Sequence, residues 1–379
     1  MTVMVPASHR IRVAVDAHVV GRRKTGNETY IVNLVQALMR RDDIDPTVYL
    51  DAGAEWPTTC PPLRRDLRAR APYLRVPVEL PFRARRDGAE LLHVQYVAPP
   101  LARLPIVTAI HDVSFEDVPG LFSRPTEMRL KLTVRLSAKR SAAVITISEF
   151  TRSRISRHYG IDPGRIVVTP LGVEPFWHPT SEEDASKHLS ALGLPARFVL
   201  AVGNLHPRKN IPRLIRALAG ARSRGAGDLH LVLAGQRGWK AAAVDSAIDA
   251  AGGRGWVHEL GYVDVETLRA LNSAAHLVAY PSTYEGFGLP VLEALACGAV
   301  VLAADATAIP EVAGDAAVLV DPDDDGAVTE GLLLAATDEA LRSRLRLRGP
   351  VRAAAFTWDA CAERTMEAYR LALGGDGSR

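Results

Sequence analysis

Short apolar runs, each followed by a helical pattern of residues, recur along most of the chain and restrict its fold more than any other feature of the sequence. The first run, Ile11–Val15, meets Asp16 and a loop from Gly21 to Gly26 before a helical pattern over Glu28–Met39. Parallel strands need a crossover connection, and an α-helix usually supplies it. The alternation therefore predicts an α/β protein built on parallel, doubly wound sheets.

Two groups of such runs lie on either side of a proline-rich segment. The first group continues with Thr47–Leu50, Leu91–Val94, Ile106–Ile110 and Ala143–Ile147. The second group comprises Phe198–Val202, Leu229–Ala234, Val257–Leu260, Leu277–Tyr280, Val300–Ala303 and Ala317–Val320. Prolines between residues 170 and 179 exclude a helix there, because proline lacks the N–H donor and restricts the residue before it. We therefore predict Rossmann-like domains over residues 1–175 and 176–355, followed by a helical segment over 356–373.

Cysteine usage and hydropathy limit the class of protein. The three cysteines, Cys60, Cys297 and Cys361, lie far apart in the sequence, which supports neither a disulfide framework nor a cysteine-rich zinc site. The first ten residues lack the pattern of a signal peptide, and no run approaches 18 uninterrupted apolar residues. We expect a cytoplasmic protein without a membrane span.

Charge is distributed unevenly along the chain. The net charge of +3 combines +8 over residues 1–179 with −5 over the remainder. Two acidic partners fit the basic half: anionic lipid headgroups at the inner face of the membrane, through peripheral contact, or a phosphorylated acceptor. The alternative is a solvated face of scattered arginines. We expect no nucleic acid partner.

The most informative segment is Tyr280–Gly298, whose central part, Tyr284–Glu293, reads Tyr-Glu-Gly-Phe-Gly-Leu-Pro-Val-Leu-Glu. Glu285 and Glu293 bracket a Gly-Phe-Gly turn and the start of a helix. The two glycines let backbone N–H groups approach a ligand closely, and Pro290 favours a helix whose N-terminal end attracts phosphate. Glu293, about one turn into this helix, can accept hydrogen bonds from sugar hydroxyls.

This segment resembles the retaining glycosyltransferases of family 4, which have the GT-B fold of two Rossmann-like domains facing across a cleft. The resemblance implies that Glu285 lies beside the donor sugar and that Glu293 binds the ribose. The turn and helix start would contact the sugar and diphosphate through Gly286, Phe287, Gly288 and Leu289. The helix over 356–373 would cross back onto the N-terminal domain. The alternative is a capped loop and helix without a ligand.

A pair of cations follows the run Phe198–Val202. Gly203 stands at the expected strand end, and Arg208 and Lys209 follow it in a segment that resembles the family's donor phosphate site. Charge-assisted hydrogen bonds to phosphate are strong, and a departing nucleotide diphosphate gains negative charge in the transition state. We therefore expect both cations to act in catalysis as well as in binding, the alternative being surface charge.

The loop after the first strand also matches the family. The segment Lys24–Ile31 resembles its glycine-rich first loop, whose backbone faces the diphosphate and the acceptor. Gly26 and Asn27 are the candidate contacts. Glu28 stands where the family often has a second glycine.

His111 follows the run Ile106–Ile110 and resembles the family's histidine that contacts the transferred sugar. Ligands of open α/β sheets bind at the carboxyl ends of strands, which favours this role over a packing role. Asp112 either orients the imidazole or caps the next turn. In the C-terminal half, Tyr262 and Val263 lie in a segment that matches the family near its base pocket.

The resemblance implies metal-independent hexosyl transfer (EC 2.4.1 type) from a nucleotide-diphosphate sugar, without a cofactor. The sequence shows no Asp-x-Asp cluster after a strand and no His/Asp set at metal-ligand spacing. The pattern around Val15 and His111 resembles bacterial mannosyl- or rhamnosyl-type transferases of polysaccharide and glycolipid assembly. GDP-mannose is therefore our first donor and polysaccharide biosynthesis our first setting, while UDP- and dTDP-linked sugars stay open. A saccharide, a lipid-linked molecule and a small molecule all remain possible acceptors.

Three other functions stay open. A catalytically silent GT-B protein that binds a nucleotide or a partner protein would keep the fold but not need His111, Glu285 and both cations. A sugar-nucleotide epimerase or a phosphorylase would share the phosphate contacts, although the pyridoxal-bearing lysine segment of a phosphorylase is missing. The absence of G-x-G-x-x-G after the first strand argues against a nicotinamide-dependent dehydrogenase.

Overall fold

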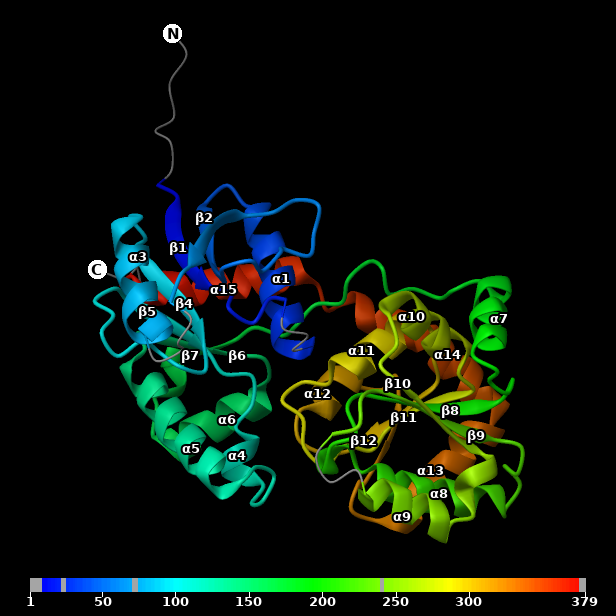
Figure 1. The fold of residues 1–379 in the computed structure, drawn as a ribbon. Helices are drawn as coiled ribbons and strands as arrows, with labels where there is room; N and C mark the ends of the chain where they lie inside the picture. The colour runs from blue at the N-terminus through cyan, green and yellow to red at the C-terminus, as the bar shows by residue number, and fades with distance from the viewer. Residues whose placement is uncertain (1–8, 22–24, 70–73, 239–241, 375–379) are drawn as a thin grey trace. The chain divides into compact units, whose positions relative to one another are not determined.

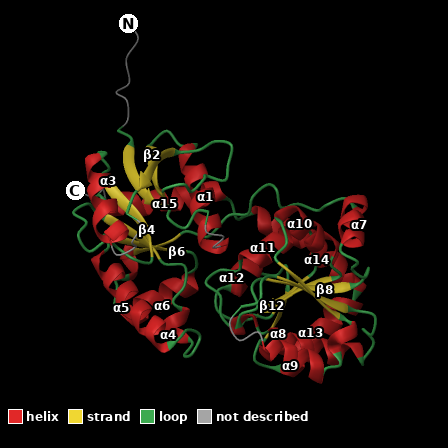
Figure 2. Ribbon diagram, viewed as in Figure 1, coloured by secondary structure: helices red, strands yellow, loops and turns green. Residues whose placement is uncertain are grey.

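The computed structural model describes residues 9–21, 25–69, 74–238 and 242–374 (Figure 1). Two compact units divide the chain: unit 1 comprises Met1–Gly172 and Trp358–Arg379, and unit 2 comprises Val173–Thr357. Each unit is a parallel sheet with helices on both faces (Figure 2). The prediction of two Rossmann-like, doubly wound units is confirmed.

Unit 1 contains a seven-stranded sheet in the order β3-β2-β1-β4-β5-β6-β7. Its strands are β1 (Ile11–Asp16), β2 (Ile44–Asp51), β3 (Leu63–Leu67), β4 (Leu91–Gln95), β5 (Ile106–Ala109), β6 (Ala143–Thr146) and β7 (Ile166–Val168). Its helices are α1 (Thr25–Met39), α3 (Leu80–Arg86), α4 (Ser114–Asp117), α5 (Arg124–Arg140), α6 (Glu149–Tyr159) and α15 (Trp358–Ala372), with short helical turns at Arg75–Glu79 and Pro163–Arg165.

The central strands of this sheet are apolar because helices cover both of their faces. All residues of β4, β5 and β6 are buried. Helices α1 and α15 lie against one face, and α15 contacts β5, β6 and β7 as well as α1. Helices α3, α5 and α6 contribute to the clusters of buried side chains on the other face.

Two strands of unit 1 were not expected from the sequence. Edge strand β3 reads Leu-Arg-Arg-Asp-Leu and pairs with β2 from Thr47 onward, so its charged side chains remain in contact with water. Strand β7 has only three residues and pairs with β6. Neither offers a run of apolar residues long enough to indicate a buried strand.

Unit 2 contains a six-stranded parallel sheet in the order β10-β9-β8-β11-β12-β13. Its strands are β8 (Phe198–Val202), β9 (His230–Ala234), β10 (Val257–Gly261), β11 (Leu277–Tyr280), β12 (Val301–Ala304) and β13 (Val318–Val320). Its helices are α7 (Glu182–Ala191), α8 (Ile211–Arg222), α9 (Ala242–Ala250), α10 (Val265–Ala274), α11 (Leu289–Ala296), α12 (Ile309–Ala313), α13 (Asp325–Thr337) and α14 (Glu339–Ala354), with short turns at Pro207–Lys209 and Gly253–Gly255.

A single cluster of buried side chains fills the core of unit 2 between the sheet and helices α8, α9 and α13. Helices α10, α11 and α14 pack against one another, as Figure 1 shows on the opposite side of the sheet. The six apolar runs that predict this sheet all form strands, with ends displaced by one residue at most. No helix of the described residues is long and apolar enough to cross a membrane.

Candidate active site

Strand order reverses direction once in each sheet, and the predicted site residues gather near these points. In unit 2 the reversal lies between the neighbouring strands β8 and β11. Loops that leave such a pair of strands diverge to opposite faces of the sheet and open a crevice at the carboxyl ends. Gly203, Arg208 and Lys209 follow β8, and Glu285 follows β11.

Glu285 is the centre of a buried charged cluster at this position. Lys209 Nζ lies 2.7 Å from Glu285 Oε1, and Arg208 Nη1 lies 3.6 Å from Glu285 Oε2. The Tyr280 hydroxyl donates to Glu285 Oε1 at 3.0 Å, and Lys209 Nζ lies 4.3 Å from the centroid of the Tyr280 ring. The structure therefore brings the neighbouring cations Arg208 and Lys209 to a glutamate more than 70 positions later in the sequence.

The charges in this cluster hold Glu285 in its ionised form. Burial alone would raise the pKa of Glu285, but the charges of Lys209 and Arg208, with hydrogen bonds from Lys209 and Tyr280, lower it to about 2. Burial lowers the pKa of Lys209, while the charge of Glu285 opposes that shift. The cluster is a preformed arrangement of two cations around one anion.

Close backbone contacts fix both loops of the cluster. Gly203 has a φ of +120°, and a Cβ added there would lie 3.1 Å from Cε of Lys209. Gly288 has a φ of +109°, and its Cβ would lie 2.5 Å from Cδ1 of Ile309. These two positions favour glycine because any other residue would adopt a strained positive φ and press its Cβ against the side chain of Lys209 or Ile309.

The signature turn ends at the start of α11, as predicted. Gly288 is the N-cap residue, Leu289 is the first helical residue and Pro290 lies in the first turn. Glu285, Gly286 and Phe287 precede the helix and are buried. Pro290 brings no N–H to the first turn, and the Val291 N–H donates to the Gly288 carbonyl at 2.9 Å.

Glu293 lies in α11, and its carboxyl group is in a different state from that of Glu285. Burial, and next the charge of Glu174, raise the pKa of Glu293 to about 8. The carboxyl group is therefore mostly protonated at pH 7 and offers one hydrogen-bond donor as well as acceptors. A carboxyl group that both donates and accepts hydrogen bonds can bind a pair of neighbouring hydroxyl groups.

Two residues of this site were missed by the sequence reasoning. Tyr280 ends β11 and donates to Glu285, which its place at the strand end could have indicated. Thr307 accepts a hydrogen bond from the backbone N–H of Glu285 at 3.1 Å, with a φ of +56° that is unusual for a threonine. No sequence signal could have indicated that conformation.

Tyr262 and Val263 lie directly after edge strand β10, two strands away from β8. The Tyr262 side chain is exposed, and within the described residues no hydrogen bond or ring contact joins it to the Glu285 cluster. Its expected part in a base pocket stays a prediction.

His111 of unit 1 is buried directly after β5. Its Nε2 lies 3.2 Å from Oε1 of Gln95, which ends β4, and the ring of Tyr30 meets it edge-on at 4.5 Å between centroids. Burial lowers the pKa of His111 to about 4, although the charge of Asp112 opposes the shift, so the ring is neutral at pH 7. Asp112 caps the next turn by accepting from Ser114 N at 3.0 Å.

Gln95 is a further residue that the sequence reasoning missed. It is buried at the carboxyl end of β4, the strand that neighbours β1 where the order of this sheet reverses. Its side-chain Nε2 has no hydrogen-bond partner among the described residues. The sequence did carry a signal, because Gln95 is a polar residue at the end of the mainly apolar run Leu91–Val94.

A buried chain of hydrogen bonds connects the surroundings of His111 to α15. The Tyr30 hydroxyl lies 3.3 Å from Nε2 of His93, and the Tyr369 hydroxyl lies 2.6 Å from Nδ1 of the same ring. Burial, and next the charge of His111, lower the pKa of His93 to about 3. A neutral imidazole has one N–H, so one tyrosine hydroxyl donates to His93 and the other accepts.

Gly26 and Asn27 lie in the first turn of α1. The helix begins at Thr25, earlier than the expected start at Glu28, so these residues belong to the helix rather than to the loop before it. Glu28 Oε1 accepts from the backbone N–H of Gly21 at 2.7 Å, which ties the helix to the preceding loop. Arg22 to Lys24 of the predicted loop lie outside the described residues.

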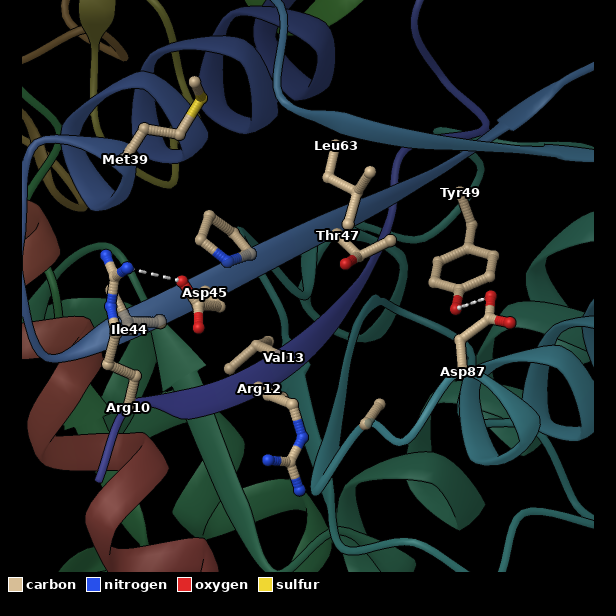
Figure 3. A pocket seen from close by; sticks show the side chains of 12 residues that line it. Arg10, Arg12, Val13, Met39, Ile44, Asp45, Thr47, Tyr49, Leu63 and Asp87 are labelled. Atoms are coloured by element: carbon tan, nitrogen blue, oxygen red, sulfur yellow. Dashed lines mark hydrogen bonds and ion pairs between the residues drawn. The ribbon is translucent and has the colours of Figure 1, made fainter.

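Other parts of the described structure offer no competing site. Within these residues no group of three or more His, Cys, Asp or Glu side chains is arranged to hold a metal ion. A cavity of about 380 Å³ opens beside the first residues of β1 and β2, where Arg10 pairs with Asp45 and Tyr49 with Asp87 (Figure 3). No predicted site residue lines it, so we assign it no part in the reaction.

Comparisons with known proteins identify both halves of the chain. Residues 184–351 match the family described as "Glycosyl transferases group 1", and residues 25–175 match "Glycosyltransferase Family 4". The chain is 34% identical to O-antigen chain mannosyltransferase B of Escherichia coli over 266 residues, which cover 70% of each protein. It is 30% identical to D-inositol 3-phosphate glycosyltransferase of Corynebacterium diphtheriae over 60% of this chain and 55% of that protein.

Solved structures share the fold across nearly the whole chain. Sucrose-phosphate synthase of Thermosynechococcus elongatus has a TM-score of 0.77 at 22% identity, covering 95% of this chain and 98% of its own. Anabaena HepE in complex with UDP-glucose has a TM-score of 0.76 at 20% identity, covering 95% and 99%. These likenesses confirm the predicted GT-B fold.

Proposed function

This chain belongs to the family 4 glycosyltransferases, and from that premise we propose that it transfers a mannosyl residue from GDP-mannose, with retention of configuration. The acceptor is a saccharide, a glycolipid or a small molecule. The observation that carries the proposal is the cluster of Glu285, Lys209 and Arg208 at the strand-order reversal of unit 2. The mannosyl donor is supported by the identity of 34% to a bacterial O-antigen mannosyltransferase.

The two cations account for the departure of the nucleotide. The bond between the anomeric carbon and the diphosphate oxygen breaks, and negative charge grows on the diphosphate. Lys209 and Arg208 are held at a fixed position by Glu285 before the donor arrives, so they can stabilise that charge without costly rearrangement. We propose that they do so without a metal ion.

Glu285 is poorly suited to attack the sugar itself. Its oxygens already interact with Lys209, Arg208 and Tyr280, and its low pKa marks it as a weak nucleophile. This supports attack by the acceptor hydroxyl on the face from which the diphosphate leaves. The new carbon–oxygen bond then forms as the old one breaks, and a phosphate oxygen takes the acceptor's proton.

Neutral groups complete the proposed contacts. Glu293 in its protonated form binds the ribose hydroxyls, and the turn from Gly286 to Leu289 meets the sugar and the diphosphate. In unit 1 we propose that His111 contacts the transferred sugar as a neutral imidazole, and that Gln95 contributes its unpartnered amide N–H groups to a hydroxyl.

The test is thermal stabilisation by GDP, UDP, dTDP, ADP and their hexose conjugates in the presence of EDTA. A ligand that binds the native state alone at about 100 times its Kd stabilises it by about 2.7 kcal/mol. We expect a selective shift with GDP and GDP-mannose, lost in Lys209→Ala and kept in the control Lys187→Ala, which alters an exposed ion pair on α7. A selective shift with another base would overturn the GDP donor, and no shift with any nucleotide would favour a catalytically silent protein.

Retention is tested separately on the product. The anomeric configuration of the mannosyl product, read by nuclear magnetic resonance, should match that of GDP-mannose. An inverted product would overturn the proposed attack on the leaving-group face, whatever the donor.

A further inference from the structure

Helix α5 (Arg124–Arg140) of unit 1 exposes a stripe of large apolar side chains. Met128, Leu132 and Leu136 are 72%, 61% and 57% exposed, and their spacing of four residues places them along one face of the helix. The opposite face is fixed in the core by Val134, Ser137 and Ala138. The apolar stripe therefore points away from the unit and cannot turn inward.

Cations outnumber carboxylates around this stripe. The exposed positively charged residues of the helix are Arg124, Arg129, Arg135, Lys139 and Arg140. The hydrogen bond from Lys131 lowers the pKa of Glu127, and the charge of Arg124 adds to this shift. Arg129, Arg135 and Lys139 form no ion pair with another residue that the structure describes. The one acidic residue of α5, Glu127, pairs with Lys131 at 2.8 Å and adds no negative charge to the exposed face.

The loop between β4 and β5 packs against α5 and also exposes apolar and basic side chains. Its backbone N–H at Ala98 donates to Ser137 Oγ at 2.9 Å, and Arg140 donates to the carbonyl of Ala102 at 2.8 Å, so the loop is packed onto α5. Leu101 of this loop is 65% exposed, Arg103 is exposed, and residues 96–105 contain no carboxylate. We call the exposed side of α5, with Met128, Leu132, Leu136 and the cations beside them, the basic apolar face.

Such a surface differs from an ordinary solvated helix face, where opposite charges alternate and large apolar groups are scattered. Three aligned apolar side chains within a field of unpaired cations match the interface of an anionic bilayer. The apolar groups enter the boundary between headgroups and acyl chains, while the arginines and lysine meet lipid phosphates. Lipid phosphates are available at any spacing along the helix, whereas an acidic protein would have to match the positions of the cations.

We propose that the basic apolar face docks unit 1 onto an anionic lipid bilayer. The proposal concerns attachment and does not depend on the identity of the donor or the acceptor. It assigns part of the positive charge of the N-terminal half to one defined surface.

The experiment is co-sedimentation of the full chain with lipid vesicles, without nucleotide or acceptor. Vesicles of phosphatidylcholine alone are compared with vesicles that contain about 30% phosphatidylglycerol, at low and high salt. One variant removes charge (Arg124→Gln, Arg129→Gln, Arg135→Gln and Lys139→Gln), and a second removes apolar groups (Met128→Gln, Leu132→Gln and Leu136→Gln). Circular dichroism and the melting temperature establish that each variant is folded.

A matched control is available on α14 of unit 2. Leu347 and Val351 are 76% and 75% exposed, but the arginines beside Leu347 have carboxylate partners: Arg346 Nη1 lies 3.8 Å from Glu339 and Arg348 Nη1 lies 2.6 Å from Asp315. The double variant Leu347→Gln and Val351→Gln removes comparable exposed apolar area without touching the basic apolar face.

We expect the wild type and the α14 control to bind anionic vesicles, less strongly at high salt, and both α5 variants to bind at least about tenfold more weakly. Equal binding by the folded α5 variants and the wild type would overturn the proposal. So would failure of the wild type to bind anionic vesicles, which would point to a protein partner, or equal binding to phosphatidylcholine alone, because charge would then have no part.

Discussion

Replacement of Glu293 by glutamine should change how the stability of the protein depends on pH. The pKa of Glu293 is raised from 4.5 to about 8 in the folded chain by burial and by Glu174. Between these values the unfolded chain releases this proton and the folded chain keeps it, so stability falls as pH rises through this window. A pKa that rises from 4.5 to about 8 corresponds to a free energy of about 5 kcal/mol. Because the Glu293 side chain keeps partial contact with solvent, we expect about half of that.

Glutamine cannot ionise, so the Glu293→Gln variant should gain about 2–3 kcal/mol on the wild type between pH 5 and pH 8.5. Urea unfolding at a series of pH values measures the difference, and the two curves should diverge only above about pH 5. Glu174→Gln is the control. It removes the smaller of the two causes of the raised pKa of Glu293, so it should reduce the dependence of stability on pH less than Glu293→Gln does. A difference between Glu293→Gln and wild type that is constant over this range would refute the reasoning.

Three further predictions follow from contacts in the two units. Lys209→Ala removes the cation that we propose for a donor phosphate, so it should weaken GDP binding by roughly 1.5–3 kcal/mol, measured by calorimetry. Lys187→Ala is the control. Equal GDP affinities of Lys209→Ala and the wild type would contradict the assignment of the donor site. Gly288→Ala should destabilise the protein by about 1–3 kcal/mol, because the new Cβ meets Cδ1 of Ile309. Adding Ile309→Val removes that methyl group and should recover part of the lost melting temperature. No recovery in the double variant would exclude the steric cause. Tyr369→Phe should cost about 1–3 kcal/mol in urea unfolding, because it leaves a buried nitrogen of His93 without its partner. It should leave GDP affinity unchanged, since the nucleotide contacts that we propose for Lys209 and Glu293 lie in unit 2.

The fold could be predicted in large part because buried parallel strands are apolar throughout. All six strands of unit 2 and five of the seven in unit 1 correspond to apolar runs in the sequence. The two remaining strands carry weaker signals: β3 is an edge strand with two arginines, and β7 is an apolar run of only three residues, of which Ile166 is buried in the core. Hydropathy alone does not distinguish a charged edge strand, or so short an apolar run, from a loop.

The candidate site was predictable as a set of residues but not as a set of contacts. The motifs around Arg208, Lys209 and Glu285 indicated a donor site, and the strand order explains why they meet. The sequence could not show that Glu285 binds both cations, or that its neighbour in the motif, Glu293, holds a proton at neutral pH. Both properties depend on burial and on distances to residues far away in the chain, such as Glu174.

Completion of unit 1 by α15 has a consequence for the order of events during synthesis. The helix covers β5, β6 and β7, yet the ribosome makes it only after the 185 residues of unit 2, Val173–Thr357. At about 5–20 residues per second, the apolar face that receives Tyr369 and Met366 waits roughly 10–40 s for its cover. Unit 2 is continuous in the chain and can fold within that time. The nascent unit 1 is thus a natural client for a chaperone that shields this face until α15 arrives.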